Sequence, residues 1–366
     1  MLIQLALTGL LVALLPLAIV LTSNDASKYR KLVWITLFLT FDLIMFGAFT
    51  RLTDSGLGCP DWPGCYSQAN PVQALADIRA AEALMPTGPV TLAKAWIEMI
   101  HRYLAMAVGV LIIAIMVVAW RQWLKSARQL LNFAPGLPTA LFFLVCLQGA
   151  FGAWTVTMKL QPIIVTIHLV LGLTMLGLLL ILASRHSVHS TVAAGARTVF
   201  APAIIALGLL AAQVVLGGWV STNYAVLACT DFPLCHGMLI PPMDFVHSFS
   251  LWRELGKTAA GDLLPVEALT AIHWVHRNFA FIVIAYIAWL AHKAYKIEGL
   301  RKTGKWILIA LAVQFATGVS TIFLSWPILI AVMHNGGAAL LVLLMVLLIY
   351  KSRLSPTVRE PHLSGD

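Results

Sequence analysis

This chain of 366 residues contains nine long runs of apolar residues, which shorter polar segments separate. Each run is close to the length of about 20 residues that a helix needs to cross a bilayer. The first run lacks the basic start and the small-residue cleavage site of a signal peptide, so we interpret it as a true span. The pattern therefore predicts an all-α polytopic membrane protein with about nine spans, at residues 2–22, 31–52, 96–119, 137–157, 162–184, 198–221, 269–292, 304–325 and 328–350.

Composition agrees with lipid as the surroundings of most of the chain. Charged residues make up 11% of the sequence and hydrophobic residues 60%, with a mean hydropathy of +0.89, whereas soluble domains have about 25% charged residues. The net charge of +9 would suit a nucleic-acid partner. The basic residues lie in short loops between spans, however, where membrane topology alone explains them. We therefore expect membrane lipid and no nucleic acid as a partner.

The distribution of lysine and arginine predicts the orientation. Of the 24 such residues, 16 fall in the loops and tails on one side of the predicted bundle and 8 on the other. The positive-inside rule makes the first side cytoplasmic. With nine spans, the N-terminus is then periplasmic and the C-terminus cytoplasmic.

An internal repeat sets the predicted domain organisation. Two loops carry CPDWPGC and CTDFPLC, and each first cysteine follows a glycine, Gly47 or Gly217, by 12 positions. Matched spacing of this kind indicates a duplicated unit. We expect two pseudo-symmetric four-helix bundles at 31–190 and 191–350, an extra N-terminal helix and linker at 1–30, and a cytoplasmic tail at 351–366.

The paired cysteines, Cys59 with Cys65 and Cys229 with Cys235, lie in the predicted outer loops. Disulfides persist in that compartment, and the spacing does not suit a zinc knuckle. We predict two short-loop disulfides, with a redox-active dithiol as the alternative. Cys146 falls inside a span, where we expect it to pack in the core.

Two spans open with related polar motifs. In EMIHR, Glu98 precedes His101 by three residues, so the two share a helical face. In HWVHR, His276 occupies the place of His101, and His273 that of Glu98. A glutamate near the end of a membrane helix is costly and suggests a function. Only the first copy has a carboxylate at this position.

Each copy has a second intramembrane histidine. Gln148 precedes His168 by 20 residues, and Gln314 precedes His334 by the same distance. All four histidines lie a few residues into spans that start outside, which places them in the outer leaflet.

Two histidines facing each other across a helical bundle suit axial ligation of haem. One isolated histidine would more simply be a satisfied core residue, but four at matched positions weaken that interpretation. Zinc and non-haem iron would need three or four clustered ligands. Arginines beside two of the histidines could pair with haem propionates. The candidate ligands are His101, His168, His276 and His334, and the candidate propionate partners are Arg102 and Arg277.

These motifs together resemble the haem A synthase family. The likeness covers about residues 31–350 and includes TRLTDSGLGCPDWPGC, Glu-x-x-His-Arg in the first half, and Q-G-x-x-G-x-x-T before a later histidine. The resemblance implies oxidation of the C8 methyl of haem O to a formyl group, giving haem A for cytochrome c oxidase. It implies that His101 and His168 bind the substrate haem, that His276 and His334 bind a haem b cofactor, and that Glu98 is the catalytic acid.

The resemblance also implies a bacterial inner membrane location, with a haem O synthase and an electron acceptor as partners. A homo-oligomer is compatible with the sequence. Glu98 could act as a base, stabilise positive charge, or merely pair with Arg102 at the membrane surface. Asp42, in the second span, is more simply explained as a carboxyl that links two helices than as a site. The alternative functions are a di-haem b-type electron carrier and a haem carrier or chaperone.

Overall fold

A computed structural model describes residues 1–24 and 27–354. Within these ranges the chain forms helices, turns and a few isolated β-bridges. Nine of the described helices are long and apolar enough to cross a membrane, which confirms the predicted fold class. They are α1 (Leu2–Thr22), α2 (Lys28–Leu52), α4 (Leu92–Lys125), α5 (Gly136–Thr157), α6 (Pro162–Arg185), α7 (Phe200–Thr222), α9 (Val266–Tyr295), α10 (Arg301–Phe323) and α11 (Ile328–Ser352).

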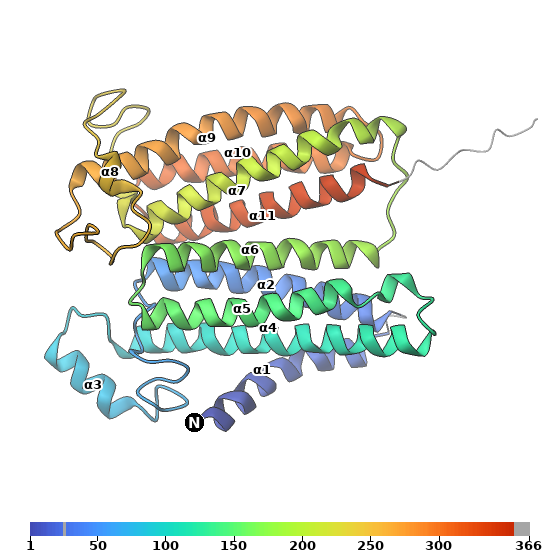
Figure 1. The fold of residues 1–366 in the computed structure, drawn as a ribbon, viewed down its shortest axis with the longest axis horizontal. Helices are drawn as coiled ribbons and strands as arrows, with labels where there is room; N and C mark the ends of the chain where they lie inside the picture. The colour runs from blue at the N-terminus through green and yellow to red at the C-terminus, as the bar shows by residue number, and fades with distance from the viewer. Residues whose placement is uncertain (25–26, 355–366) are drawn as a thin grey trace, which may run out of the picture.

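Shorter elements lie between the spans. The first long loop contains α3 (Leu75–Leu84), and the second long loop contains α8 (Phe245–Ser248). Three short 3-10 turns, η1 (Leu131–Phe133), η2 (Ala194–Val199) and η3 (Ala225–Leu227), lie in other connections. Both long loops lie at the same end of the bundle, which we call the loop end (Figure 1). Residues 355–366 of the predicted tail lie outside the described residues.

Helix α4 extends beyond its predicted span at both ends. The Thr91 side chain accepts a hydrogen bond from the Lys94 N–H, so the helix starts at Leu92. At the other end α4 continues through polar positions to Lys125. The apolar run marked only the part of the helix that suits the bilayer interior.

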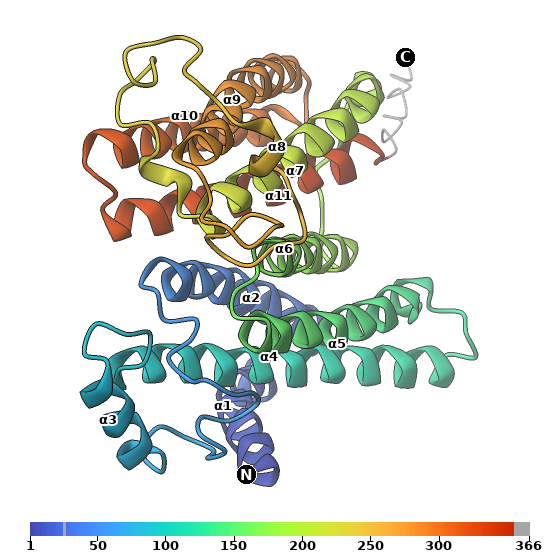
Figure 2. The ribbon, with the colours of Figure 1, turned by 60° about the vertical axis from the view of Figure 1, so that its left-hand side comes forward.

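Eight of the nine described spans form two groups of four, with α2, α4, α5 and α6 in the first half and α7, α9, α10 and α11 in the second (Figures 1 and 2). Within the first half each helix contacts its two neighbours in the order α2–α4–α5–α6, and α6 returns to α2. The second half repeats this ring as α7–α9–α10–α11. Helices α4 and α6 are therefore diagonal partners, as are α9 and α11. The halves meet through α2, α6, α7 and α11.

Matched positions of the two halves touch at the loop end of this interface. The Arg51 guanidinium donates to the Ser221 carbonyl, and the Tyr224 hydroxyl donates to Asp54 Oδ1 at 2.6 Å. In the register set by Gly47 and Gly217, Arg51 corresponds to Ser221 and Asp54 to Tyr224. The two halves are thus arranged about a pseudo-two-fold axis that passes close to these contacts.

Helix α1 packs on α4 and reaches the first long loop. Gly9 lies so close to α4 that an added Cβ would be 2.8 Å from Met106 Cβ. Leu5 is buried with Cys59 and Met99 in a cluster beneath the loop. Although α1 has no counterpart in the second half, it supports the α4 segment that carries Glu98.

The surroundings of two side chains in the spans, those of Cys146 and Asp42, differ from the ones predicted. Cys146 is exposed on α5, which faces outward over most of its length, so it does not pack in the core. No hydrogen bond or ion pair joins Asp42 to another residue in the described part of the chain, so it does not form the expected link between helices.

We predict that Gly9→Leu will separate α1 from α4 and destabilise the protein by about 1–3 kcal/mol, the usual cost of overpacking. Gly208→Leu is the matched control, because Gly208 has open space around it on the exposed side of α7. Thermal unfolding in detergent should show a lower midpoint for Gly9→Leu alone. Equal midpoints for both variants would contradict the proposed close packing.

Candidate functional site

The four candidate histidines lie near the loop end, on diagonal pairs of helices. His101 is on α4 and His168 on α6, while His276 is on α9 and His334 on α11. Each lies six to ten residues after the first residue of its helix, and all four helices start at the loop end. The two histidines of each half therefore approach the bundle interior from opposite corners at a similar depth.

Every one of these imidazole rings lies against a glycine of an adjacent helix. An added Cβ would come within 3.0 Å of His101 at Gly47, 3.3 Å of His168 at Gly152, 3.0 Å of His276 at Gly217 and 2.9 Å of His334 at Gly318. A side chain at any of these glycines would need the space that the ring occupies. Glycine permits this close approach of ring and backbone.

Glutamines contact three of the four histidines. Gln148 Nε2 lies 3.3 Å from His168 Nε2, and Gln314 Nε2 lies 3.3 Å from His334 Nε2. Gln213 Nε2 lies 3.1 Å from His276 Nδ1. Within the described residues, the amide oxygens of these glutamines are buried without a hydrogen-bond partner. Gln213 was not among the residues predicted from the sequence, although a glutamine four residues before the glycine recurs at 148, 213 and 314.

The position occupied by Glu98 and His273 has one structural role in both halves. Glu98 Oε2 accepts the N–H of Cys59 at 2.8 Å, and His273 Nδ1 accepts the N–H of Cys229 at 3.2 Å. Both side chains are buried, with 4% exposure. In each half this residue connects the histidine-bearing helix to the cysteine loop, but only the first half uses a carboxylate for it.

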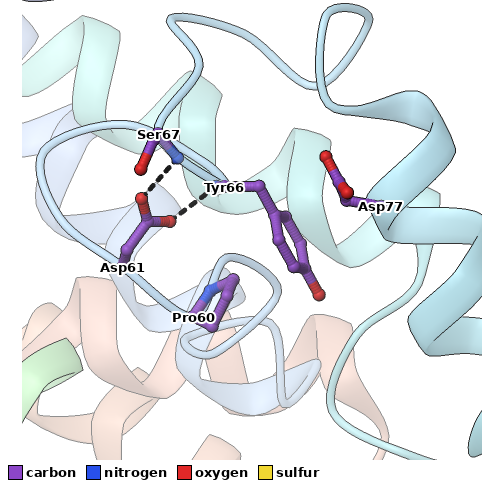
Figure 3. Close-up of a pocket in the computed structure, with 5 residues that line it drawn as sticks. All are labelled: Pro60, Asp61, Tyr66, Ser67 and Asp77. Carbon is purple, nitrogen blue, oxygen red and sulfur yellow. Dashed lines mark hydrogen bonds between the residues drawn. The ribbon is translucent and has the colours of Figure 1, made fainter.

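Both predicted disulfides, Cys59–Cys65 and Cys229–Cys235, are present in the structure. Inside the first loop, Asp61 accepts the N–H groups of Tyr66 and Ser67, each at 2.6 Å (Figure 3). Together with Pro60 and Asp77, these residues line a shallow hollow.

The second loop repeats this turn. Asp231 accepts the N–H groups of His236 and Gly237 at 2.7 and 2.8 Å. These hydrogen bonds, that from Gly237 foremost, lower the pKa of the Asp231 carboxyl. Each aspartate thus fixes the backbone that follows the second cysteine.

Arg102 and Arg277 differ in how many of their donors are engaged. Arg102 Nη1 donates to the carbonyls of Asp61 at 2.9 Å and Pro63 at 3.2 Å, and also to that of Gly64, while Nη2 donates to Glu98. Arg277 Nη2 donates to the Leu234 carbonyl at 3.0 Å, and its Nη1 is buried with no partner in the described chain. Pairing with propionates remains a prediction for both, and the free donor of Arg277 suits it better.

The Glu98–Arg102 ion pair forms, but it is not at the solvent-exposed surface where the simplest alternative placed it. The side chains are only 5% and 10% exposed. The loop between α2 and α4 folds over them, so this pair belongs to a buried network that also contains Cys59 and the loop carbonyls.

These features fit a flat tetrapyrrole with two axial histidines in each half. Glycines let each ring lie against the backbone of an adjacent helix, and a glutamine amide lies beside three of the four rings. Over residues 1–24 and 27–354, no three histidine, cysteine, aspartate or glutamate side chains cluster as a metal site would require. A metal bound directly by three or four protein ligands is not supported by the described residues.

Comparison with known proteins gives consistent matches. The model of a family described as "Cytochrome oxidase assembly protein" matches residues 30–346. A protein of Shewanella oneidensis named "Heme A synthase" is 38% identical over 325 residues, which cover 87% of this chain and 96% of that protein. Proteins with the same name from Rhodopseudomonas palustris and Halalkalibacterium halodurans are 28% and 26% identical, over 90% and 80% of this chain and 93% and 86% of their own lengths.

We predict that Arg102→Gln will loosen the first cysteine loop far more than Arg277→Gln loosens the second. Arg102 holds three loop carbonyls and Glu98, whereas Arg277 holds one carbonyl. Losing charged hydrogen bonds worth about 1.5–3 kcal/mol should speed reduction of Cys59–Cys65 by about 10- to 100-fold. Mass mapping of alkylated cysteines after timed exposure to a thiol reductant measures both loops at once. Unchanged reduction of Cys59–Cys65 in Arg102→Gln would contradict this assignment.

Proposed function

Because this chain belongs to the cytochrome oxidase assembly protein family, we propose that it is a haem A synthase, an oxidoreductase that acts on haem O. The proposed reaction converts the C8 methyl of haem O to a formyl group. It removes four electrons from the substrate and adds one oxygen atom.

One observation carries the proposal beyond the names of relatives. Two closely similar histidine sites differ in charge at the position one turn before the first histidine, where Glu98 stands in one half and His273 in the other. An electron carrier with two equivalent haems has no need of that difference. A carboxylate in one site only is what an enzyme that modifies one of two bound haems requires.

We infer that the first half binds haem O through His101 and His168, and that the second half binds haem b through His276 and His334. Gly47 and Gly152 let the rings of the first pair lie against the backbone of the adjacent helices, as Gly217 and Gly318 do for the second pair. When bound, haem b supplies one-electron redox chemistry to an acceptor outside the chain.

Glu98 is held in place by its neighbours. Arg102 donates to Oε1 and the Cys59 N–H to Oε2, so both carboxylate oxygens have fixed directions. Helix α4 puts this carboxylate one turn from His101, at the edge of the site. There it can accept a proton, or stabilise positive charge that develops as the methyl carbon is oxidised. Burial under the loop keeps water from screening that charge.

The loop end would face the periplasm of a bacterial inner membrane, as the distribution of basic residues predicts. A haem O synthase would supply the substrate through the lipid phase, and a separate electron acceptor would complete the reaction. The haem sites would then lie in the outer leaflet.

We predict that His276→Ala and His334→Ala remove the resident haem b, whereas His101→Ala and His168→Ala leave much of it bound. The reason is that each haem depends on the histidines of its own half. Optical spectra of the four purified variants, with haem extracted and identified, distinguish the sites. Equal loss of haem b in all four variants would exclude this division between the halves.

We predict that Glu98→Gln lowers turnover by about 10²–10⁴-fold, the usual contribution of a positioned acid–base group. Glutamine keeps the volume and helix propensity of glutamate, so His101 should still bind substrate. Haem O, or a singly hydroxylated product, should accumulate. The measurement is the ratio of haem A to haem O in cells at equal protein level.

Glu267→Gln is the matched control, because Glu267 is exposed in the first turn of α9, the counterpart of α4. It should give a normal ratio of haem A to haem O. A near-normal ratio in Glu98→Gln as well would remove the chemical role of Glu98 and favour a di-haem electron carrier.

A further inference from the structure

The two halves differ at the Nδ1 atoms of their histidines. In the second half, Thr317 Oγ1 lies 3.1 Å from His334 Nδ1, and Gln213 Nε2 lies 3.1 Å from His276 Nδ1. In the first half, His168 Nδ1 is buried, and no described residue forms a hydrogen bond with it. The second half thus has polar side chains at both Nδ1 atoms.

The repeat shows which first-half residues stand at these places. When Gly47 is aligned with Gly217, Leu43 falls at the position equivalent to Gln213. When Gln148 is aligned with Gln314, Phe151 falls at the position equivalent to Thr317. Neither leucine nor phenylalanine has a hydrogen-bonding side chain, so the first half lacks both contacts.

Thr317 is arranged to accept a hydrogen bond. Its hydroxyl lies 2.9 Å from the Val313 carbonyl and 3.1 Å from the Gln314 carbonyl, and it donates to this helical backbone. The hydroxyl lone pairs therefore remain available to an N–H at His334 Nδ1.

Gln213 can do the same after a half-turn of its amide. Its Oε1 is buried and has no partner among the described residues. The half-turn replaces the hydrogen bond from Nε2 to the His276 carbonyl, at 3.1 Å, with one from the His276 Nδ1–H to Oε1, and it sets Oε1 beside that carbonyl.

We propose that Thr317 and Gln213 are positioning residues that make the second half a permanent haem site, while Phe151 and Leu43 leave the first half exchangeable. This inference rests on the haem ligation proposed above. A ligating imidazole that donates its other N–H has a fixed orientation and is a stronger electron donor. A cofactor haem benefits from such retention, whereas a substrate haem must leave after each turnover.

The test uses rates of haem loss from the purified full-length protein to excess apomyoglobin, together with the midpoint potential of each haem. Thr317→Val and Gln213→Leu should each speed haem loss from the second half by about 10- to 100-fold, the usual effect of removing such a partner. Their haem should also have a higher potential, because a weaker donor stabilises ferric iron less. Thr317→Ser keeps the hydroxyl and should behave as the unmodified protein does.

The reciprocal variants Phe151→Thr and Leu43→Gln should slow loss of haem from the first half. Thr174→Val is the control for a threonine-to-valine change in a span, since the exposed Thr174 hydroxyl donates to the Val170 carbonyl of its own helix and has no other partner among the described residues. It should change neither rate nor potential.

The outcomes separate the two proposals. Retention of second-half haem in both His276→Ala and His334→Ala would overturn the haem ligation itself. Loss of haem in those variants, with unchanged rates and potentials in Thr317→Val and Gln213→Leu, would overturn only the positioning role. If the valine variant does not fold, unchanged haem loss in Phe151→Thr gives the same negative answer.

Discussion

The contact between an imidazole ring and a glycine backbone occurs four times, and the rest of each half is arranged around it. It joins α2 to α4, α5 to α6, α7 to α9 and α10 to α11. Because the glycine has no side chain, the ring sets how closely the two helices approach. The histidines then stand on diagonal helices, so each pair reaches the interior of its half, where we propose that a haem binds.

On this nearly symmetric scaffold, chemical differences are confined to a few side chains. Glu98 and His273 form the same hydrogen bond to a cysteine N–H, yet only one can carry a full negative charge against a bound porphyrin. Thr317 and Phe151 occupy equivalent helical positions, yet only threonine can form a hydrogen bond with a histidine ring nitrogen. Because the shared fold gives both sites a similar backbone geometry, single side chains are what distinguish them.

The sequence predicts the spans, the repeat, both disulfides and the histidine-bearing helices well, because each depends on long apolar runs or matched spacing within one segment. It predicts poorly what depends on contacts between distant segments. One of the alternatives for Glu98 placed its pair with Arg102 near water, but the loop that contains Cys59 covers this pair. Gln213 went unnoticed because its importance comes from a ring 63 residues away. Cys146 shows the same limit, since an apolar helix does not reveal which face meets lipid.

The contacts of Arg51 with Ser221 and of Asp54 with Tyr224 have an evolutionary consequence. In a symmetric dimer of identical halves, residues beside the two-fold axis meet their own copies. Asp54 would then face a second aspartate, and Arg51 a second arginine, with like charges opposed. Joining both halves in one chain lets each side of the axis change independently, so that an aspartate can meet a tyrosine. Such pairs of unlike residues distinguish the first half from the second, and a homodimer could not have acquired them.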